Sequence, residues 1–118
     1  MGLLIESAVF QEILKFREQF FYDFDIHFWR TQSGAEVDFV LYKSDNEILP
    51  IEAKYRMMKK PMITRSLRSF ITAYNPEIAI VISKNFKSEI IIENTKIYFI
   101  PFQNILEIFP LIKDVLTL

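Results

Sequence analysis

The sequence predicts a single mixed α/β domain in which one helix is followed by three strands, a second helix and a further strand. Three observations predict this order. A helical pattern of apolar residues opens the chain, two apolar runs around a polar turn follow it, and a second helical pattern leads into a short apolar run typical of a buried strand. The chain has 118 residues, enough for one hydrophobic core, so residues 1–118 are taken as one domain.

The composition excludes several classes of protein. Basic and acidic residues nearly balance, 14 against 15, so any attraction to nucleic acid has to be local. The absence of Cys excludes disulfides and thiolate metal sites and fits a cytoplasmic protein. No apolar run is long enough to span a membrane, and the first residues lack the basic stretch of a signal peptide. With two Gly, the chain has no phosphate-binding glycine loop.

The first helix is expected over residues 3–20, where apolar residues recur at helical spacing. Glu6 lies within one turn of Val9 and Phe10, and therefore near the edge of the buried face. From spacing alone, the simpler interpretation of Glu6 is a favourable negative charge in the first turn of a helix.

Three strands are expected next, separated by a turn at residues 31–34 and by a polar loop; they cover residues 26–30, 36–42 and 48–54. His27, the only histidine, is expected at the sheet surface and has no second histidine for a zinc site. Pro50 cannot donate a ladder hydrogen bond. Its strand is therefore expected to pair poorly on one side, or to bulge just before Glu52 and re-aim the side chains there.

The second and third strands each carry an acid among apolar residues. Asp38 stands between Val37 and Phe39, and Glu52 is followed two positions later by Lys54, on the same strand face. If the strands pair across their turn, Asp38 and Glu52 lie side by side with Lys54 next to them. Two carboxylates and an ammonium in this arrangement indicate a metal site, and a structural ion pair is the alternative.

A strongly basic segment follows the third strand. A helix is expected over residues 62–74, with Pro61 suited to its start, and no acid occurs between Ala53 and Pro76. Basic runs are usually solvated surface, but this one begins at the candidate metal site, which favours phosphate binding. The candidate nucleic-acid-binding residues are Arg56, Lys59, Lys60, Arg65 and Arg68.

The rest of the chain completes the sheet. Residues 77–83 form an almost continuous apolar run, which predicts a buried strand reached by a right-handed parallel crossover. Residues 88–93 and 96–100 are expected to form two more strands around a turn at Asn94 and Thr95. Residues 102–116 have helical spacing interrupted by Pro110, which predicts two short helical pieces or a kink.

Carboxylate oxygens are hard donors that suit Mg²⁺ or Mn²⁺. A metal held by Asp38 and Glu52 would bind a phosphate oxygen and lower the pKa of a bound water, and the Lys54 ammonium would stabilise charge that builds on phosphorus. Glu6 would complete the metal shell if the first helix packs beside this end of the hairpin. These are the parts required for metal-assisted hydrolysis of a phosphodiester.

These residues carry a resemblance. Asp38 and, fourteen positions later, Glu52-Ala53-Lys54 resemble the signature of the PD-(D/E)XK nuclease superfamily, whose core has the same element order. More narrowly, the chain is similar to the domain that follows the ATPase module in many archaeal and bacterial AAA-type ATPases. The segments that carry this similarity are Leu4-Ile5-Glu6, Phe28-Trp29-Arg30-Thr31, Gly34-Ala35-Glu36-Val37-Asp38-Phe39-Val40 and Pro50-Ile51-Glu52-Ala53-Lys54.

The resemblance implies a restriction-endonuclease-like fold with a mixed central sheet flanked by helices. It also implies that Asp38 and Glu52 are metal ligands, Lys54 the catalytic lysine, and Glu6 the helix acid beside the metal. Val37 departs from the family pattern, which has Pro at this position. The ATPase half is missing as well, so we expect a stand-alone remnant gene or an excised domain, with an ATPase partner acting in trans.

A free domain of this kind is expected to form a homodimer that hides apolar surface, with residues 105–118 as one candidate interface. Two functional hypotheses remain open: a Mg²⁺-dependent nuclease acting on DNA, and a catalytically silent DNA- or protein-binding module, since a fold does not fix a function. A third, purely structural reading buries two acids against one lysine. It is disfavoured because one negative charge is left over.

Overall fold

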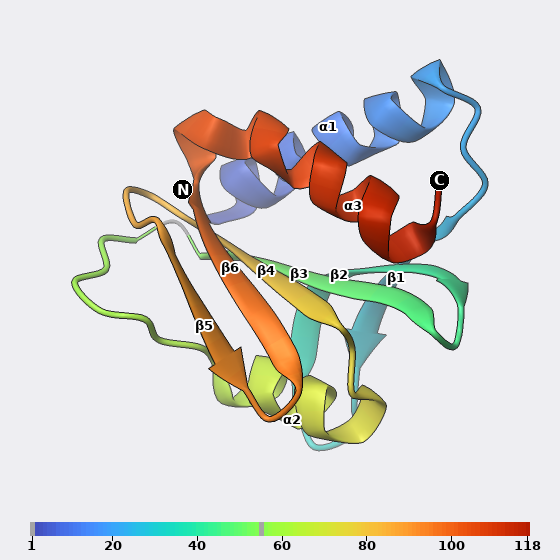
Figure 1. Ribbon diagram of the computed structural model, residues 1–118. Helices are drawn as coiled ribbons and strands as arrows, with labels where there is room; N and C mark the ends of the chain where they lie inside the picture. Colours follow the sequence, from blue (N-terminus) through green and yellow to red (C-terminus); the bar gives the residue numbers. More distant parts are fainter. Residues whose placement is uncertain (1, 55) are drawn as a thin grey trace.

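The computed structural model describes residues 2–54 and 56–118, which form three layers. A six-stranded sheet lies in the middle, with helices α1 (Gly2–Gln19) and α3 (Ile108–Leu116) over one face and helix α2 (Arg65–Tyr74) against the other (Figure 1). The predicted α/β class, with helices on both faces of a mixed sheet, is confirmed.

The sheet has the order β1-β2-β3-β4-β6-β5. Its strands are β1 (Asp25–Arg30), β2 (Glu36–Ser44), β3 (Glu47–Lys54), β4 (Ile78–Ser83), β5 (Ser88–Ile92) and β6 (Thr95–Pro101). β1, β2 and β3 form an antiparallel meander, β3, β4 and β6 run parallel, and β5 pairs antiparallel with β6. The parallel β3–β4 pair with α2 between them in the chain is the expected strand–helix–strand passage.

Each face of the sheet has its own hydrophobic core. Between the sheet and the α1–α3 layer lie residues such as Val9, Ile51 and Ile112, all fully buried. Between the sheet and α2 lie residues such as Leu67 and Phe99. The alternation along β3 explains the division, because neighbouring strand residues point to opposite faces and both faces are covered.

The C-terminal segment contributes to the hydrophobic core. A 3₁₀ helix (Phe102–Glu107) leads into α3, and Pro110 is the third residue of α3, so the chain forms two helical pieces as predicted. The buried residues of α3 are Ile108, Ile112, Val115 and Leu116. Residues 105–118 therefore bury many of their apolar side chains against their own sheet, while Leu106 stays 69% exposed. Their role as one candidate dimer interface, like dimerisation itself, stays a prediction.

The predicted bulge before Glu52 is wrong. Pro50 lies opposite Val40 within a stretch of β2–β3 pairs that is regular from Phe39–Ile51 to Tyr42–Ile48. Pairing of β3 with β4 begins only at Ile51, so the missing Pro50 amide interrupts no β3–β4 bond. The alternative, poor pairing on one side, is correct. The β4 side of β3 stays unpaired at Pro50.

A bulge does occur near the candidate site, but on β2. His27 pairs with Val40 and Trp29 with Val37, so the single residue Phe28 faces two residues, Asp38 and Phe39. An extra residue in one strand bends it and re-aims its side chains.

Helix α2 begins later than predicted, at Arg65 instead of Met62. Thr64 is its N-cap: its backbone is extended, and its hydroxyl oxygen accepts the Leu67 amide at 3.0 Å. A Thr side chain satisfies an amide that the helix itself leaves without an acceptor. Pro61 therefore lies in the loop before the helix.

None of the helices in the described part of the chain is long and apolar enough to cross a membrane.

Candidate functional site

Asp38 sits at the point where β2 separates from β3. The last backbone pair of these strands is Phe39 with Ile51, and beyond it the Asp38 carboxylate takes over as acceptor: Oδ2 receives the Ala53 amide at 2.8 Å. The β2 bulge positions this side chain, since it places Asp38 and Phe39 together opposite Phe28. One carboxylate oxygen of Asp38 thus has a structural role.

Glu6 of α1 lies against Asp38. A hydrogen bond between the two carboxyls is the largest cause of a rise in the Glu6 pKa to about 7, with burial second and the charge of Asp38 third. Two adjacent carboxyls share a proton because both cannot be ionised cheaply. The expectation that Glu6 is a first-turn helix charge is wrong, because α1 starts at Gly2 and has no acid in its first turn.

Glu52 is buried, with 1% of its surface exposed. Its Oε1 accepts a hydrogen bond from the Thr64 hydroxyl at 2.8 Å, while its buried Oε2 has no hydrogen-bond partner. Burial raises the Glu52 pKa to about 7, and the negative charge of Asp38 adds to the rise; the Thr64 bond and the Lys54 charge act against it. Ionising this buried carboxyl is therefore energetically costly, and a bound cation would lower that cost.

Lys54 is the last residue of β3 and is half-buried. It is close enough to two of the acids for its charge to act on them. Its charge lowers the pKa of both Glu6 and Glu52. It belongs to no ion pair within residues 2–54 and 56–118. The sequence prediction that Asp38, Glu52 and Lys54 meet at one end of the hairpin agrees with these interactions.

The three acids reach this end from α1, β2 and β3, but they do not form a closed ligand set. Across the described ranges, no group of three or more His, Cys, Asp or Glu side chains is arranged to hold a metal ion. Glu52 is turned toward Thr64, whereas Glu6 is paired with Asp38. The residues still fit a hard cation: all donors are oxygens, and one of them, Glu52 Oε2, is buried without a partner.

A cavity of about 390 Å³ opens beside Asp38, between α1 and strands β1 and β2. Three aromatic rings and four charged side chains contribute to its wall. It is lined by Glu6, Ser7, Phe10, Phe28, Arg30, Glu36, Val37, Asp38 and Phe39. Arg30 and Glu36 form an ion pair at its rim, with Nε and Oε2 3.4 Å apart.

The candidate nucleic-acid-binding residues all lie on the surface, in the loop after β3 and on α2. Arg56, Lys59, Lys60, Arg65 and Arg68 are exposed, and none takes part in an ion pair with another residue that the structure describes. Arg56 is the nearest to the acids, since its charge lowers the Glu52 pKa. Exposed cations without acidic partners are available to an external anion.

Thr64 and Ser66 belong to the site and were not predicted. Thr64 binds Glu52, and the Ser66 hydroxyl accepts the Glu36 amide at 3.1 Å, so the first turn of α2 contacts both β3 and β2. The signal for Thr64 was available: a hydroxyl residue just before an apolar helical run is a typical N-cap. No sequence pattern indicated its contact with Glu52, because that contact depends on tertiary packing.

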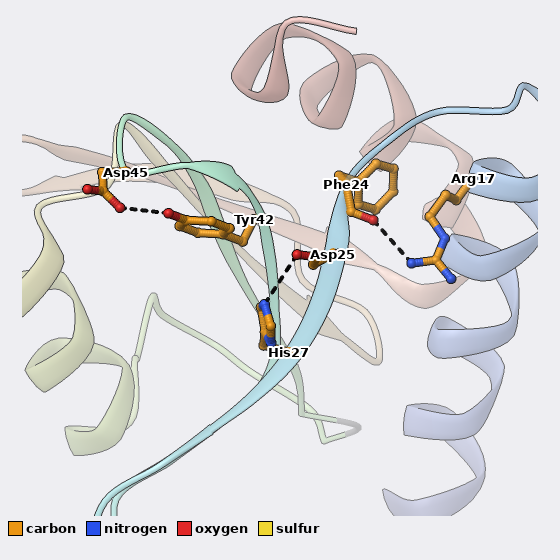
Figure 2. Close-up of polar contacts among 6 residues, drawn as sticks. All are labelled: Arg17, Phe24, Asp25, His27, Tyr42 and Asp45. Atoms are coloured by element: carbon orange, nitrogen blue, oxygen red, sulfur yellow. Dashed lines mark hydrogen bonds and ion pairs between the residues drawn. The ribbon is translucent and has the colours of Figure 1, made fainter.

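His27 lies outside this site, as predicted. Figure 2 shows its ring beside Asp25, with Nε2 and Oδ2 3.8 Å apart and both side chains largely exposed. On the same part of the molecule, Tyr42 donates to Asp45 and Arg17 donates to the Phe24 carbonyl. Each of these polar groups has its partner locally, so this surface has a structural explanation.

Comparisons with known proteins fit the fold. The family model described as "Domain of unknown function (DUF4143)" matches residues 1–105. Among solved structures, the chain is similar to a chain of the "Refined half-complex from tetradecameric assembly of Thermococcus gammatolerans McrB AAA+ hexamers with bound McrC", with a TM-score of 0.59 and 16% identity. The match covers 86% of this chain and 28% of that one, so this chain spans little more than a quarter of its neighbour's length. At this identity the likeness shows the fold alone. A search of the curated proteins found no match.

Proposed function

The chain belongs to the DUF4143 family, and we propose that it is a metal-dependent domain of the PD-(D/E)XK nuclease type that hydrolyses DNA phosphodiester bonds. Asp38 and Glu52 would hold Mg²⁺ or Mn²⁺, with Glu6 completing the shell. One observation carries the proposal: Glu52 keeps a buried carboxyl oxygen without a partner, within the field of Asp38, whose carboxyl is itself paired with Glu6. A cation would neutralise this excess of acid, which is otherwise costly.

The chain's own residues would act as follows. A bound divalent cation supplies Lewis-acid stabilisation and a water of lowered pKa. Lys54 would donate to a phosphate oxygen and stabilise the negative charge that builds during attack. As long as no cation binds it, Glu6, whose pKa is about 7, is able to take up or release a proton near neutral pH. Thr64 would keep Glu52 oriented, since it binds the other carboxyl oxygen.

The basic segment would hold the phosphates on either side of the reacting one. Arg56, Lys59 and Lys60 follow directly after the strand that carries Glu52, and Arg65 and Arg68 continue the charge along α2. Phosphate contacts of this kind fix register without reading sequence. The proposal therefore includes DNA as the partner and no base-sequence specificity from these residues.

A second candidate is a DNA- or protein-binding module without catalysis. Two oxygens of the proposed ligand pair are already used inside the protein, Asp38 Oδ2 by the Ala53 amide and Glu52 Oε1 by Thr64. Asp38 is also hydrogen-bonded to Glu6, so Glu52 Oε2 is the one oxygen of the pair that has no partner among the described residues. The structural neighbour belongs to an assembly of AAA+ hexamers, which supports the proposal that a cytoplasmic ATPase binds this domain in trans.

Metal binding separates the two candidates. Calorimetry with Mn²⁺ and Mg²⁺ should give binding to the wild type and none to Asp38→Asn, with Asp45→Asn as the matched control because Asp45 is exposed and accepts only from Tyr42. The wild type and the two variants are then incubated with linear, supercoiled and branched DNA. Metal-dependent cleavage lost in Asp38→Asn and kept in Asp45→Asn supports the enzyme. A wild type that binds no metal overturns it and leaves the binding module.

A further inference from the structure

We propose that the cavity between α1 and the β1–β2 edge receives an unstacked base of single-stranded DNA, next to the proposed metal site. The substrate of this domain would then be a single-stranded or frayed segment, not a closed duplex. This inference rests on the proposed function, because it names the substrate class of that site. Three observations support it: the aromatic rings in the cavity wall, the charged side chains in that wall, and the position of the cavity beside Asp38.

Three phenylalanine rings form the apolar wall. Phe10 of α1 stacks on Phe39 of β2 with ring centroids 6.0 Å apart, and Phe28 of β1 lies 6.2 Å from Phe10 and 5.8 Å from Phe39. Phe39 is buried, whereas Phe28 keeps 62% of its surface exposed. An exposed ring in contact with two others offers a flat face for a base, and stacking on aromatic side chains accepts any base.

The charges in the cavity favour a base over a phosphate. Three carboxyl residues, Glu6, Glu36 and Asp38, contribute to its wall against one cation, Arg30. An anionic group is repelled there, while exocyclic amino groups of a neutral base find carboxylate acceptors. Arg30 stands two residues after Phe28 on the same strand, and its guanidinium, held at the rim by Glu36, would stack on the same base.

The position and size of the cavity complete the argument. It shares Glu6 and Asp38 with the proposed metal site, so a base held in it puts its own sugar-phosphate close to those carboxyls, where the proposed cation would offset their repulsion. Its volume of about 390 Å³ lies within the roughly 300–1,000 Å³ typical of sites for small organic ligands. The bases of a duplex are stacked and paired, so only an extruded or unpaired base can enter.

The test measures binding in a chelator, where cleavage cannot occur. Fluorescence anisotropy is recorded with a labelled single strand of about ten nucleotides, with a blunt duplex of the same length, and with single-stranded RNA. Phe28→Ala should weaken single-strand binding about tenfold and leave duplex binding unchanged, since stacking contributes that much per base. Phe28→Trp should restore it. Phe21→Ala is the matched control, because Phe21 is 93% exposed and lines no part of this cavity.

The possible outcomes separate this inference from the proposed function. If the wild type cleaves DNA with Mg²⁺ and Phe28→Ala binds the single strand as the wild type does, the cavity is not a base site and the nuclease proposal stands. If the wild type binds no nucleic acid in the chelator or with Mg²⁺ added, both proposals fail. Equal binding of RNA and DNA single strands would support the base site and overturn the assignment of DNA as its ligand. Competition by dAMP alone at the oligonucleotide's affinity would indicate a free-nucleotide site and overturn the proposal.

Discussion

Thr64 couples the start of α2 to the buried carboxyl of Glu52. Its hydroxyl donates to Glu52 Oε1 at 2.8 Å and accepts the Leu67 amide at 3.0 Å, so one oxygen atom serves both the helix cap and the candidate metal ligand. The orientation of Glu52 and the position of the basic helix are therefore linked through a single side chain.

The first prediction concerns the loss of this hydroxyl. Thr64→Val keeps the shape of the side chain but removes the cap and leaves both oxygens of Glu52 without a donor. We expect the free energy of unfolding to fall by about 2–3 kcal/mol, combining a lost N-cap with a buried unsatisfied acceptor. Urea unfolding measures it. Thr72→Val is the control, because Thr72 bonds Glu93 at the exposed surface and should cost less than about 0.5 kcal/mol. Equal losses in both variants would contradict the coupling.

The second prediction is a decline in stability with rising pH. The pKa of Glu52 is about 7 in the folded protein against 4.5 ordinarily, so between these values the folded state holds more protons than the unfolded state. Stability contributed by this group is full below pH 4.5 and is lost as the pH rises through 7. A shift of this size corresponds to about 3 kcal/mol, as an upper estimate.

Glu52→Gln tests this pH dependence, because the amide is neutral at every pH. Its melting temperature should be close to that of the wild type at pH 5 and above it at pH 8, in a chelator. Glu77→Gln is the control, since Glu77 is an exposed glutamate that should not change the profile. A Glu52→Gln profile that still falls with pH as steeply as the wild type would show that burial of this carboxyl is not the cause.

The third prediction concerns the basic segment. If Lys59 and Lys60 bind DNA phosphates, the double change Lys59→Ala/Lys60→Ala should weaken binding to all sequences alike. It should also reduce the slope of log affinity against log salt by roughly 2, about one for each lost contact. Lys15→Ala/Lys113→Ala removes the same charge from α1 and α3 and should keep the slope. Identical slopes for the two variants would mean that net charge alone sets the binding.

The fold was predictable from local patterns, and the site only in part. Apolar runs bounded by turns and repeats at helical spacing predicted every strand and helix within a few residues. The runs in β3 and β4 are nearly continuous because both faces of the sheet are covered. The meeting of Asp38, Glu52 and Lys54 followed from hairpin pairing. Neither the β2 bulge that aims Asp38 nor the burial of Glu52 against Thr64 has a local signal, since both depend on contacts between distant segments.

Pro50 and Glu6 illustrate the limit. A proline in a strand predicts that something changes in the pairing, and it did mark the start of the β3–β4 ladder, but the bulge belongs to the neighbouring strand. The spacing of Glu6 allowed a helix-end charge, while the packing of α1 on the sheet made it a partner of Asp38. In both cases the sequence singled out the residue, and contacts between distant segments determined its role.

The fourth prediction separates the two roles of Asp38, as a backbone acceptor and as a charge. Asp38→Asn keeps an oxygen for the Ala53 amide but removes the negative charge, whereas Asp38→Ala removes both. Because Ala53 is buried, its unpaired amide should cost Asp38→Ala about 1–3 kcal/mol of stability, and Asp38→Asn should cost less than about 1 kcal/mol. Urea unfolding of the two variants measures the difference.

The effect of the Asp38 charge is measured through the pKa of its neighbour, Glu6. Its bond and its charge both raise the Glu6 pKa, so in Asp38→Asn and in Asp38→Ala that pKa should fall from about 7 toward its ordinary 4.5. Carbon-detected NMR titration of the Glu6 carboxyl follows this directly. If Glu6 still titrates near 7 in both variants, burial alone raises its pKa, and the shared proton that makes these two carboxyls a candidate cation site does not exist.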